Sequence, residues 1–199
     1  MSSLDELYAE IARCVKCEIA NTRTNIVPGE GPENAEVMLI GEAPGWHEDQ
    51  SGRPFVGPAG QFLEELLSLG GLKRQDVYIT NVIKCRPTNN REPLPQEVGW
   101  CRPYLERQIE IIRPKVIITL GRHSLAFFFP NKSISQAHGS IQEKDGIIYY
   151  AMYHPAAALH QQSLRQVLKT DALKIPQVIA SAKKLSSKEK TEAQQLSLF

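Results

Sequence analysis

The stretch EVMLIGEAPG (Glu36–Gly45) decides the fold of this chain. Its apolar run, Val37–Ile40, is typical of a buried strand or of a core helix. The run ends at Gly41, and the proline and glycine that follow cannot continue a helix and favour a tight turn. We therefore predict a buried strand of a parallel sheet, with Glu42 at its carboxyl end, where open α/β sheets place their ligands.

Three more apolar runs have the composition of strands: Val77–Asn81, Val116–Leu120 and Ile147–Tyr153. Helical patterns separate these runs, and strands that alternate with helices predict a three-layer α/β/α sandwich around a central four-stranded, mostly parallel sheet. The carboxyl ends of parallel strands meet at one edge of a sheet. We therefore expect the residues at these ends to form one site: Glu42, Asn81, Gly121 and His154.

Helix signals surround these strands. Ser3 and Glu6 form a capping box, and apolar residues at helical spacing follow. The Gly- and Pro-rich stretch Asp49–Gly60 is predicted to be a loop, followed by a helix that ends at Gly70-Gly71. A long amphipathic helix is predicted from about Ala156.

The composition is that of one globular domain. The chain has 199 residues, enough to bury a core without disulfides, and its 23 Lys and Arg residues nearly balance its 22 Asp and Glu residues. This balance argues against a protein that coats DNA by net charge alone. No apolar run approaches the ~20 residues of a membrane span and no secretory signal is visible, so we expect a cytoplasmic protein. Residues 1–185 are predicted to form the domain, and residues 186–199 a flexible polar tail.

Four cysteines require an explanation other than disulfides in a cytoplasmic protein. Cys14 and Cys17 form a C-x2-C pair, whereas fifteen residues separate Cys85 from Cys101. Structural zinc sites usually show two tight pairs, so this spacing favours an iron–sulfur cluster over zinc, or over thiols of the core that bind no metal. Either metal would join the N-terminal helix to the loop after the second strand.

Several side chains could form a pocket for a planar base. Glu42 could be a catalytic carboxylate or only a helix cap, and Asn81 offers a donor beside an acceptor but could be an ordinary turn residue. His154 could place an imidazole in the cleft, although a single histidine is more often structural. Phe55, in a polar loop, could stack on a flat ligand or fold back onto the core. Together, these residues predict a site for a planar base with a carboxylate nearby.

The sequence closely resembles family 4 uracil-DNA glycosylases at four separate motifs. These are GEAPGWHED (Gly41–Asp49), GRPFVGPAG (Gly52–Gly60), TNVIKCRP (Thr80–Pro87) and HPAAAL (His154–Leu159), in the order of the family. The resemblance extends over residues 4–182. It implies that a monomeric enzyme excises uracil from single- or double-stranded DNA and so initiates base excision repair. It also implies a structural 4Fe–4S cluster on Cys14, Cys17, Cys85 and Cys101.

The resemblance also implies roles in the chemistry. Glu42 would orient water and stabilise the cationic sugar, and His154 would donate a hydrogen bond to the carbonyl oxygen where negative charge builds up. The target base must leave the stack to be reached. The segment Pro155–Arg165 resembles the wedge loop of the family, and Leu159 is the candidate for the side chain that enters the DNA.

A second group of residues would bind the base. The backbone of Gly41, Ala43 and Gly45 would hydrogen-bond uracil, and Phe55 would stack on it. Asn81 would select uracil over cytosine, because the amino group of cytosine reverses one donor and one acceptor.

Two alternatives to a turnover enzyme stay open on the sequence. One is a non-catalytic iron–sulfur DNA-binding or polymerase-associated module. The presence of Glu42, Asn81 and His154 together argues against it, because a protein that only binds DNA does not need all three. The other is a covalent uracil-DNA binder, which in a related branch carries a glutamine after the turn glutamate and a basic loop that ends in a nucleophilic histidine. This chain has Ala43 after the turn glutamate and no run of Lys or Arg in the loop Asn131–Gly139, so we favour turnover. His138 in that loop keeps the covalent alternative open.

The end of the chain carries a second signal. The residues Gln195, Leu196, Leu198 and Phe199 resemble the short peptide by which bacterial repair and replication proteins dock on the sliding clamp. The apolar side chains would fill pockets of the clamp, and a mobile tail can fold on binding. Docking would also raise the effective concentration of the protein at DNA. The alternative is a C-terminus that is apolar by chance.

Overall fold

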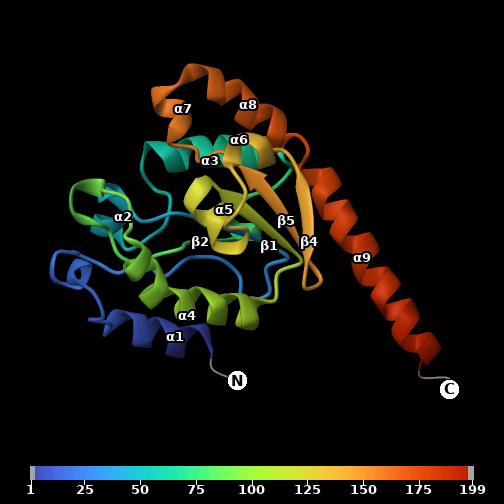
Figure 1. Cartoon of the computed structure of the whole chain (residues 1–199), viewed down its shortest axis with the longest axis horizontal. Helices are drawn as coiled ribbons and strands as arrows, with labels where there is room; N and C mark the ends of the chain where they lie inside the picture. The colour runs from blue at the N-terminus through green and yellow to red at the C-terminus, as the bar shows by residue number, and fades with distance from the viewer. Residues whose placement is uncertain (1–2, 197–199) are drawn as a thin grey trace.

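A computed structural model describes the backbone of residues 3–196 and the side chains of residues 3–185 (Figure 1). At its centre is one five-stranded sheet in the order β2-β1-β3-β5-β4. The strands are β1 (Val37–Gly41), β2 (Tyr78–Asn81), β3 (Val116–Leu120), β4 (Ile141–Lys144) and β5 (Ile147–Met152). β2, β1, β3 and β5 run parallel, and β4 runs antiparallel to β5. The predicted sandwich around a mostly parallel sheet is confirmed, with one strand more than predicted.

The prediction of four strands is wrong because β4 lacks the apolar pattern of a buried strand. Its sequence, IQEK, lies at the edge of the sheet with mostly exposed side chains, so no hydrophobic run marks it. It joins β5 through the turn Asp145-Gly146, in which the two residues have φ values of 53° and 74°. Asp-Gly is a typical hairpin turn, and this dipeptide is the signal for the missing strand.

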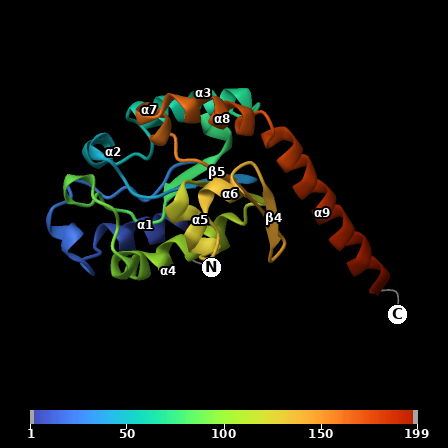
Figure 2. The ribbon, with the colours of Figure 1, turned by 45° about the horizontal axis from the view of Figure 1, so that its top comes forward.

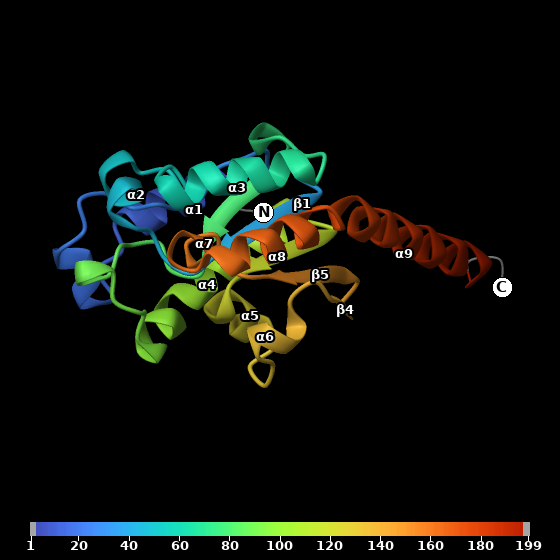
Figure 3. The same ribbon diagram turned by 90° about the horizontal axis from the view of Figure 1, so that it is seen from above.

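Helices cover both faces of the sheet, which gives three layers (Figures 2 and 3). The longer helices are α1 (Leu4–Ala12), α3 (Pro58–Leu69), α4 (Pro95–Ile112), α8 (Gln162–Ala172) and α9 (Ile175–Leu196). The shorter ones are α2 (Trp46–Ser51), α5 (Arg122–Phe128), α6 (Ile134–Ala137) and α7 (Ala157–His160), with 3₁₀ turns at Glu18–Asn21, Arg74–Asp76 and Thr88–Asn90. Successive strand residues face opposite layers: Leu39 shares a core with α3, α8 and α9, whereas Met38 and Ile40 share one with α1 and α4.

Two helix predictions need correction, and one is confirmed. The predicted loop Asp49–Gly60 is partly helical, because α2 enters its first residues and α3 begins at Pro58, a residue favoured in the first turn of a helix. The long helix predicted from about Ala156 is three helices, α7, α8 and α9, and the backbone is extended at Gln161 between the first two. The N-terminal helix is confirmed as α1, with Ser3 as its cap.

The C-terminal segment is helical as far as Leu196. Helix α9 projects away from the sheet in Figure 1, and residues 186–196 belong to it where the sequence predicted a flexible tail, so the mobility of this segment stays a prediction. Gln195 and Leu196 lie at the end of α9, and Leu198 and Phe199 lie outside the described residues. Neither α9 nor any other helix in the described part of the chain is long and apolar enough to cross a membrane.

A chain of polar groups connects the elements on the α1 side of the sheet. The hydroxyls of Tyr8 and Tyr78 lie 2.5 Å apart. Nε2 of Gln108 donates to the Tyr78 hydroxyl and to the carbonyl of Pro28, both at 2.8 Å. Tyr78 and Gln108 are fully buried, so these groups depend on one another rather than on water. The network joins helix α1, strand β2 and helix α4.

Replacing Tyr78 by phenylalanine is expected to lower the free energy of unfolding by about 1–3 kcal/mol, because it leaves an N–H of Gln108 without a partner in the core. Urea unfolding measures the change. Tyr8→Phe is the matched control: it removes the partly exposed end of the network and keeps the bond between Tyr78 and Gln108, so its effect should be smaller. Equal losses in the two variants would contradict this account.

Candidate active site

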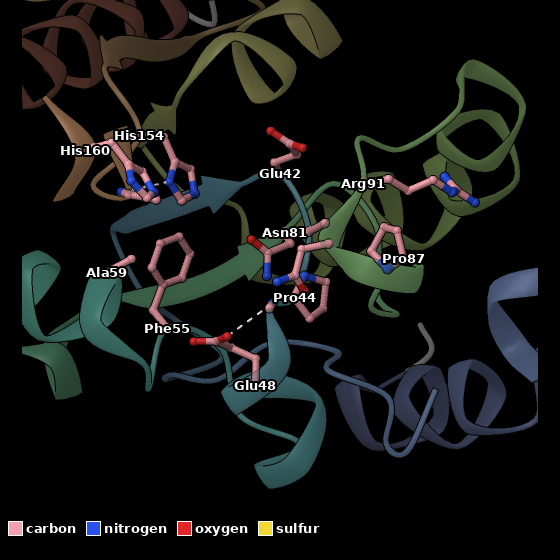
Figure 4. A pocket seen from close by; sticks show the side chains of 14 residues that line it. Glu42, Pro44, Glu48, Phe55, Ala59, Asn81, Pro87, Arg91, His154 and His160 are labelled. Atoms are coloured by element: carbon pink, nitrogen blue, oxygen red, sulfur yellow. Dashed lines mark hydrogen bonds between the residues drawn. The ribbon is translucent and has the colours of Figure 1, made fainter. Parts of the chain in front are cut away.

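The residues predicted at the strand ends converge on one site (Figure 4). Asn81 ends β2, Glu42 directly follows β1, and His154 lies two residues beyond β5. Gly121 follows β3 and lies against His154, since a Cβ at Gly121 would come within 2.9 Å of the His154 Cβ. A cavity of about 400 Å³ opens at this edge of the sheet. Its lining residues are Glu42, Ala43, Pro44, Gly45, Glu48, Phe55, Ala59, Asn81, Pro87, Asn90, Arg91, His154, Ala156 and His160.

Glu42 is a half-buried carboxylate in this cavity. Its side chain is 31% exposed, and burial raises its pKa above the usual value of a glutamate. Three neighbours act on this pKa through charge: His123 lowers it, Glu92 raises it and Arg122 lowers it. Nε2 of His123 lies 3.7 Å from Oε2 of Glu42. The ionisation of Glu42 therefore depends on side chains from other segments.

His154 is oriented by the backbone of its own turn. The N–H of Ala156 donates to Nδ1 of His154 at 3.1 Å, so the neutral ring carries its proton on Nε2. Burial lowers the pKa of His154 to about 4, so the ring is neutral at physiological pH and offers one N–H donor. The ring of Phe55 stacks on it, with the two centroids 5.5 Å apart. His160 also lines the cavity, and Figure 4 draws it on the same side as His154.

Glu48 holds the loop that carries Phe55. Its Oε1 accepts the backbone N–H groups of Val56 and Gly57 at 2.9 and 3.0 Å, and its Oε2 accepts that of Gly45 at 3.1 Å. One carboxylate thus ties the turn after β1 to the loop before α3. Phe55 itself has a φ of 51°, a left-handed conformation that is unfavourable for a bulky residue and persists only when the surroundings fix it.

Asn81 presents an amide oxygen without a partner. Its side chain is 1% exposed, and in the described part of the chain no donor forms a hydrogen bond with its Oδ1. A buried acceptor in this state is costly and requires an explanation such as a bound molecule. Gly41 leaves the space beside it, because a Cβ at Gly41 would come within 2.3 Å of Oδ1 and within 2.7 Å of the ring of Phe55. An N–H group on a ligand is the partner that this oxygen lacks.

The backbone of Asn81 is held from inside the protein by Lys84. The ammonium of Lys84 donates to Oγ1 of Thr80 and to the carbonyl of Asn81, both at 2.7 Å, and to Oε1 of Gln108 at 2.6 Å. Lys84 is fully buried, and burial lowers its pKa to about 7. These three bonds join the end of β2 to helix α4.

The four cysteines lie in one corner of the layer that contains α1 and α4. Cys85 and Cys101 are buried, Cys14 and Cys17 are partly exposed, and all four thiols are free. Burial raises the pKa of Cys85 and Cys101, that of Cys101 to about 11, and the nearby Cys17 raises both further. Nη1 of Arg23 donates to Sγ of Cys85 at 3.1 Å. In the described residues, no three or more His, Cys, Asp or Glu side chains are arranged to hold a single metal ion.

Comparison with known proteins agrees with this geometry. The profile of the family described as "Uracil DNA glycosylase superfamily" matches residues 28–175. The chain belongs to this superfamily. It is 47% identical over 195 residues to a type-4 uracil-DNA glycosylase of Sulfurisphaera tokodaii, with 92% of this chain and 88% of that protein covered. It is 48% identical over 184 residues to a type-4 uracil-DNA glycosylase of Archaeoglobus fulgidus (88% and 92% covered), and 33% identical over 170 residues to a type-5 uracil-DNA glycosylase of Pyrobaculum aerophilum (73% and 75%). The resemblance to family 4 is confirmed.

In this member of the superfamily, His138 lies outside the cavity. Its Nδ1 is 2.8 Å from Oδ2 of the buried Asp171, and its ring packs on that of Tyr153. His138 is thus paired with Asp171 and is not among the residues that line the cavity, and its role stays a prediction. Leu159, the predicted wedge, is 45% exposed on α7 and directly precedes the cavity residue His160.

Sequence reasoning about this uracil-DNA glycosylase homologue missed three residues of the site. Glu48 stands three residues after Gly45, which is the spacing of a capping box and was a usable signal. His123 comes two residues after Gly121 at a strand end, the position that identified the other site residues. His160 is part of the short helix α7 and carried no signal.

The ring of His154 is expected to stay neutral, with its proton on Nε2, from pH 8 to pH 5, because its pKa is about 4. Nitrogen-15 NMR of the ring measures both the tautomer and the titration. The folded-state pKa lies below the unfolded value of 6.5, so the protein loses stability from this residue as the pH falls from 6.5 through 4. A titration midpoint near 6.5 in the folded protein would contradict this description of the site.

Proposed function

We propose that this chain is a uracil-DNA glycosylase, which extrudes uracil from DNA, hydrolyses the bond between the base and deoxyribose, and leaves an abasic site for base excision repair. The observation that carries the proposal is the buried Oδ1 of Asn81, which has no donor among the described residues. Uracil presents an N–H beside a carbonyl oxygen, which matches the acceptor and the donor of this amide. Cytosine presents the reverse pattern. The type-4 relatives carry the same activity in their names.

Two groups would act on the bond that breaks. The Nε2–H of the neutral His154 would donate to the carbonyl oxygen of the departing uracil, where negative charge builds up. The carboxylate of Glu42 would stabilise the cationic sugar and orient the attacking water. Water then supplies a hydroxyl group to the sugar carbon and a proton to the released base, so the atoms balance.

The remaining predicted residues would hold the substrate. Phe55 would stack on the extruded base, and the backbone of Gly41, Ala43 and Gly45 would hydrogen-bond it. The base leaves the stack before it can enter the cavity. Leu159, whose exposed side chain lies next to a residue of the cavity, would fill the space that the base leaves in the DNA.

Replacing Glu42 by glutamine is expected to slow the excision of uracil about 100-fold or more, because the neutral amide neither stabilises a cation nor orients water as a carboxylate does. The rate is measured by single-turnover excision from a uracil-containing oligonucleotide, after which alkali cleaves the strand at the abasic site. Glu143→Gln makes the same change at an exposed position of β4 and should leave the rate unchanged. Equal rates in Glu42→Gln and the unmodified protein would contradict the proposed role.

We also propose that Cys14, Cys17, Cys85 and Cys101 bind a 4Fe–4S cluster. Four free thiols in one corner provide the donor set, and the guanidinium of Arg23 beside Cys85 favours the negative charge of thiolates. The sequence has only one tight pair, Cys14 and Cys17, whereas structural zinc sites usually have two, and this spacing favours a cluster over zinc. The cluster would hold the N-terminal segment against helix α4 and would take no part in the chemistry.

Purified protein is expected to be brown and to contain iron and acid-labile sulfide in equal amounts. Cys101→Ser should lose the colour and unfold at a lower temperature, because it removes a ligand in the core. Val15→Ala is the control, since Val15 is exposed between two of the predicted ligands. Colourless protein, or protein that contains zinc, would contradict the cluster and leave the glycosylase proposal intact.

The C-terminal residues Gln195, Leu196, Leu198 and Phe199 would dock on a bacterial sliding clamp. The resemblance to clamp-binding peptides supports this proposal, and α9, which ends at Leu196, projects away from the sheet (Figure 1). We propose that the protein acts as a monomer on single- or double-stranded DNA in the cytoplasm.

A further inference from the structure

His123 lies beside Glu42 and has no role in the proposed function. It is the second residue of α5, and its Nε2 is 3.7 Å from Oε2 of Glu42. This distance is too long for a direct hydrogen bond and short enough for a substantial interaction between charges. The two side chains are 24% and 31% exposed, so water and salt screen the interaction only in part.

Three other titratable or charged groups face this pair. Oε2 of Glu92, from the loop before α4, lies 3.4 Å from the same Nε2 of His123. Arg122 forms an ion pair with Glu92, and its Nε lies 3.2 Å from Nε2 of His123, a nitrogen that can accept its N–H only while the ring is neutral. His154 is close enough that the charge of His123 acts on its pKa. One oxygen of each of two carboxylates thus lies within 3.7 Å of the same imidazole nitrogen.

The position of His123 addresses a difficulty in the proposed reaction. A half-buried carboxylate tends to bind a proton, and burial raises the pKa of Glu42 accordingly. The reaction requires the ionised form, because only an anion stabilises a cationic sugar. A positive charge on His123 favours this anion, the negative charge of Glu92 opposes it, and Arg122 favours it to a smaller extent than His123.

We propose that His123 is a positioning residue of this site, whose imidazolium keeps the Glu42 carboxylate ionised, and that Glu92 holds His123 in place and limits its effect. The proposal rests on the proposed function, which gives Glu42 its role in the reaction. Because His123 acts through charge and does not touch the base, it sets the lowest pH at which the protein is active. The rate on the plateau at higher pH depends on it much less.

The test is the pH dependence of single-turnover uracil excision by the full chain. In the unmodified protein, the rate falls at acid pH as Glu42 becomes protonated. In His123→Asn this acid limb is expected to move to higher pH by about half a unit or more, and in Glu92→Gln it should move to lower pH. His123→Lys retains a positive charge and should keep the acid limb near its original position. Glu143→Gln, the exposed control, should not move it.

Two results would overturn the proposal: an acid limb that stays in place in His123→Asn, or one that moves in the same direction in His123→Asn and Glu92→Gln. Carbon-13 NMR of the Glu42 carboxyl, assigned with Glu42→Gln, measures the same ionisation without any reaction. If Glu42→Gln retains full activity, the proposed function of Glu42 fails, and the NMR titration still decides whether His123 controls its charge. If excision requires Glu42 and neither measurement responds to His123, this inference alone fails.

Discussion

The geometry of the site depends on the three hydrogen bonds that the buried ammonium group of Lys84 donates. An ammonium group away from water needs an acceptor for each N–H, and Lys84 has three, on Thr80, Asn81 and Gln108. Two of these acceptors belong to the end of β2 and the third to α4. The end of the strand is therefore fixed by groups that lie beneath the cavity. The side chain of Asn81 is left to face the cavity with an unpaired oxygen.

The same lysine lies between the cavity and the cysteines. Burial lowers its pKa, and Cys101 and Cys85 are the groups that oppose this shift. Helix α4 contributes both Cys101 and Gln108, and Lys84 directly precedes Cys85, so the cavity and the cysteine corner share two segments of chain. A cluster that holds these segments together would also hold Asn81 in place. A cluster that takes no part in the reaction would in this way still affect the position of a residue that binds the base.

Burial acts on the two central groups of the cavity in opposite directions. It raises the pKa of Glu42 and lowers that of His154, because in both cases it disfavours the charged form. For His154 this outcome suits a neutral hydrogen-bond donor. For Glu42 it works against the charge that the proposed reaction needs, which explains why a cationic partner close to the carboxylate is useful. Pairs of titratable groups whose pKa values are shifted in opposite directions by their environment are common in acid–base sites.

The sequence by itself determined the strand ends, and so the edge of the sheet at which the site lies. Apolar runs that stop at a glycine, an asparagine or a His-Pro pair are local signals, and they placed Glu42, Asn81 and His154 together. The apolar runs could not reveal β4, whose exposed side chains have no such pattern and which only the Asp145-Gly146 turn marks in the sequence. They also could not reveal the contacts of His123 and Lys84, which join segments far apart in the chain. Only the tertiary structure decided which groups are buried. Burial then sets which side chain is charged and which acceptor lacks a partner, because loss of water depends on the packing around a residue and not on its type.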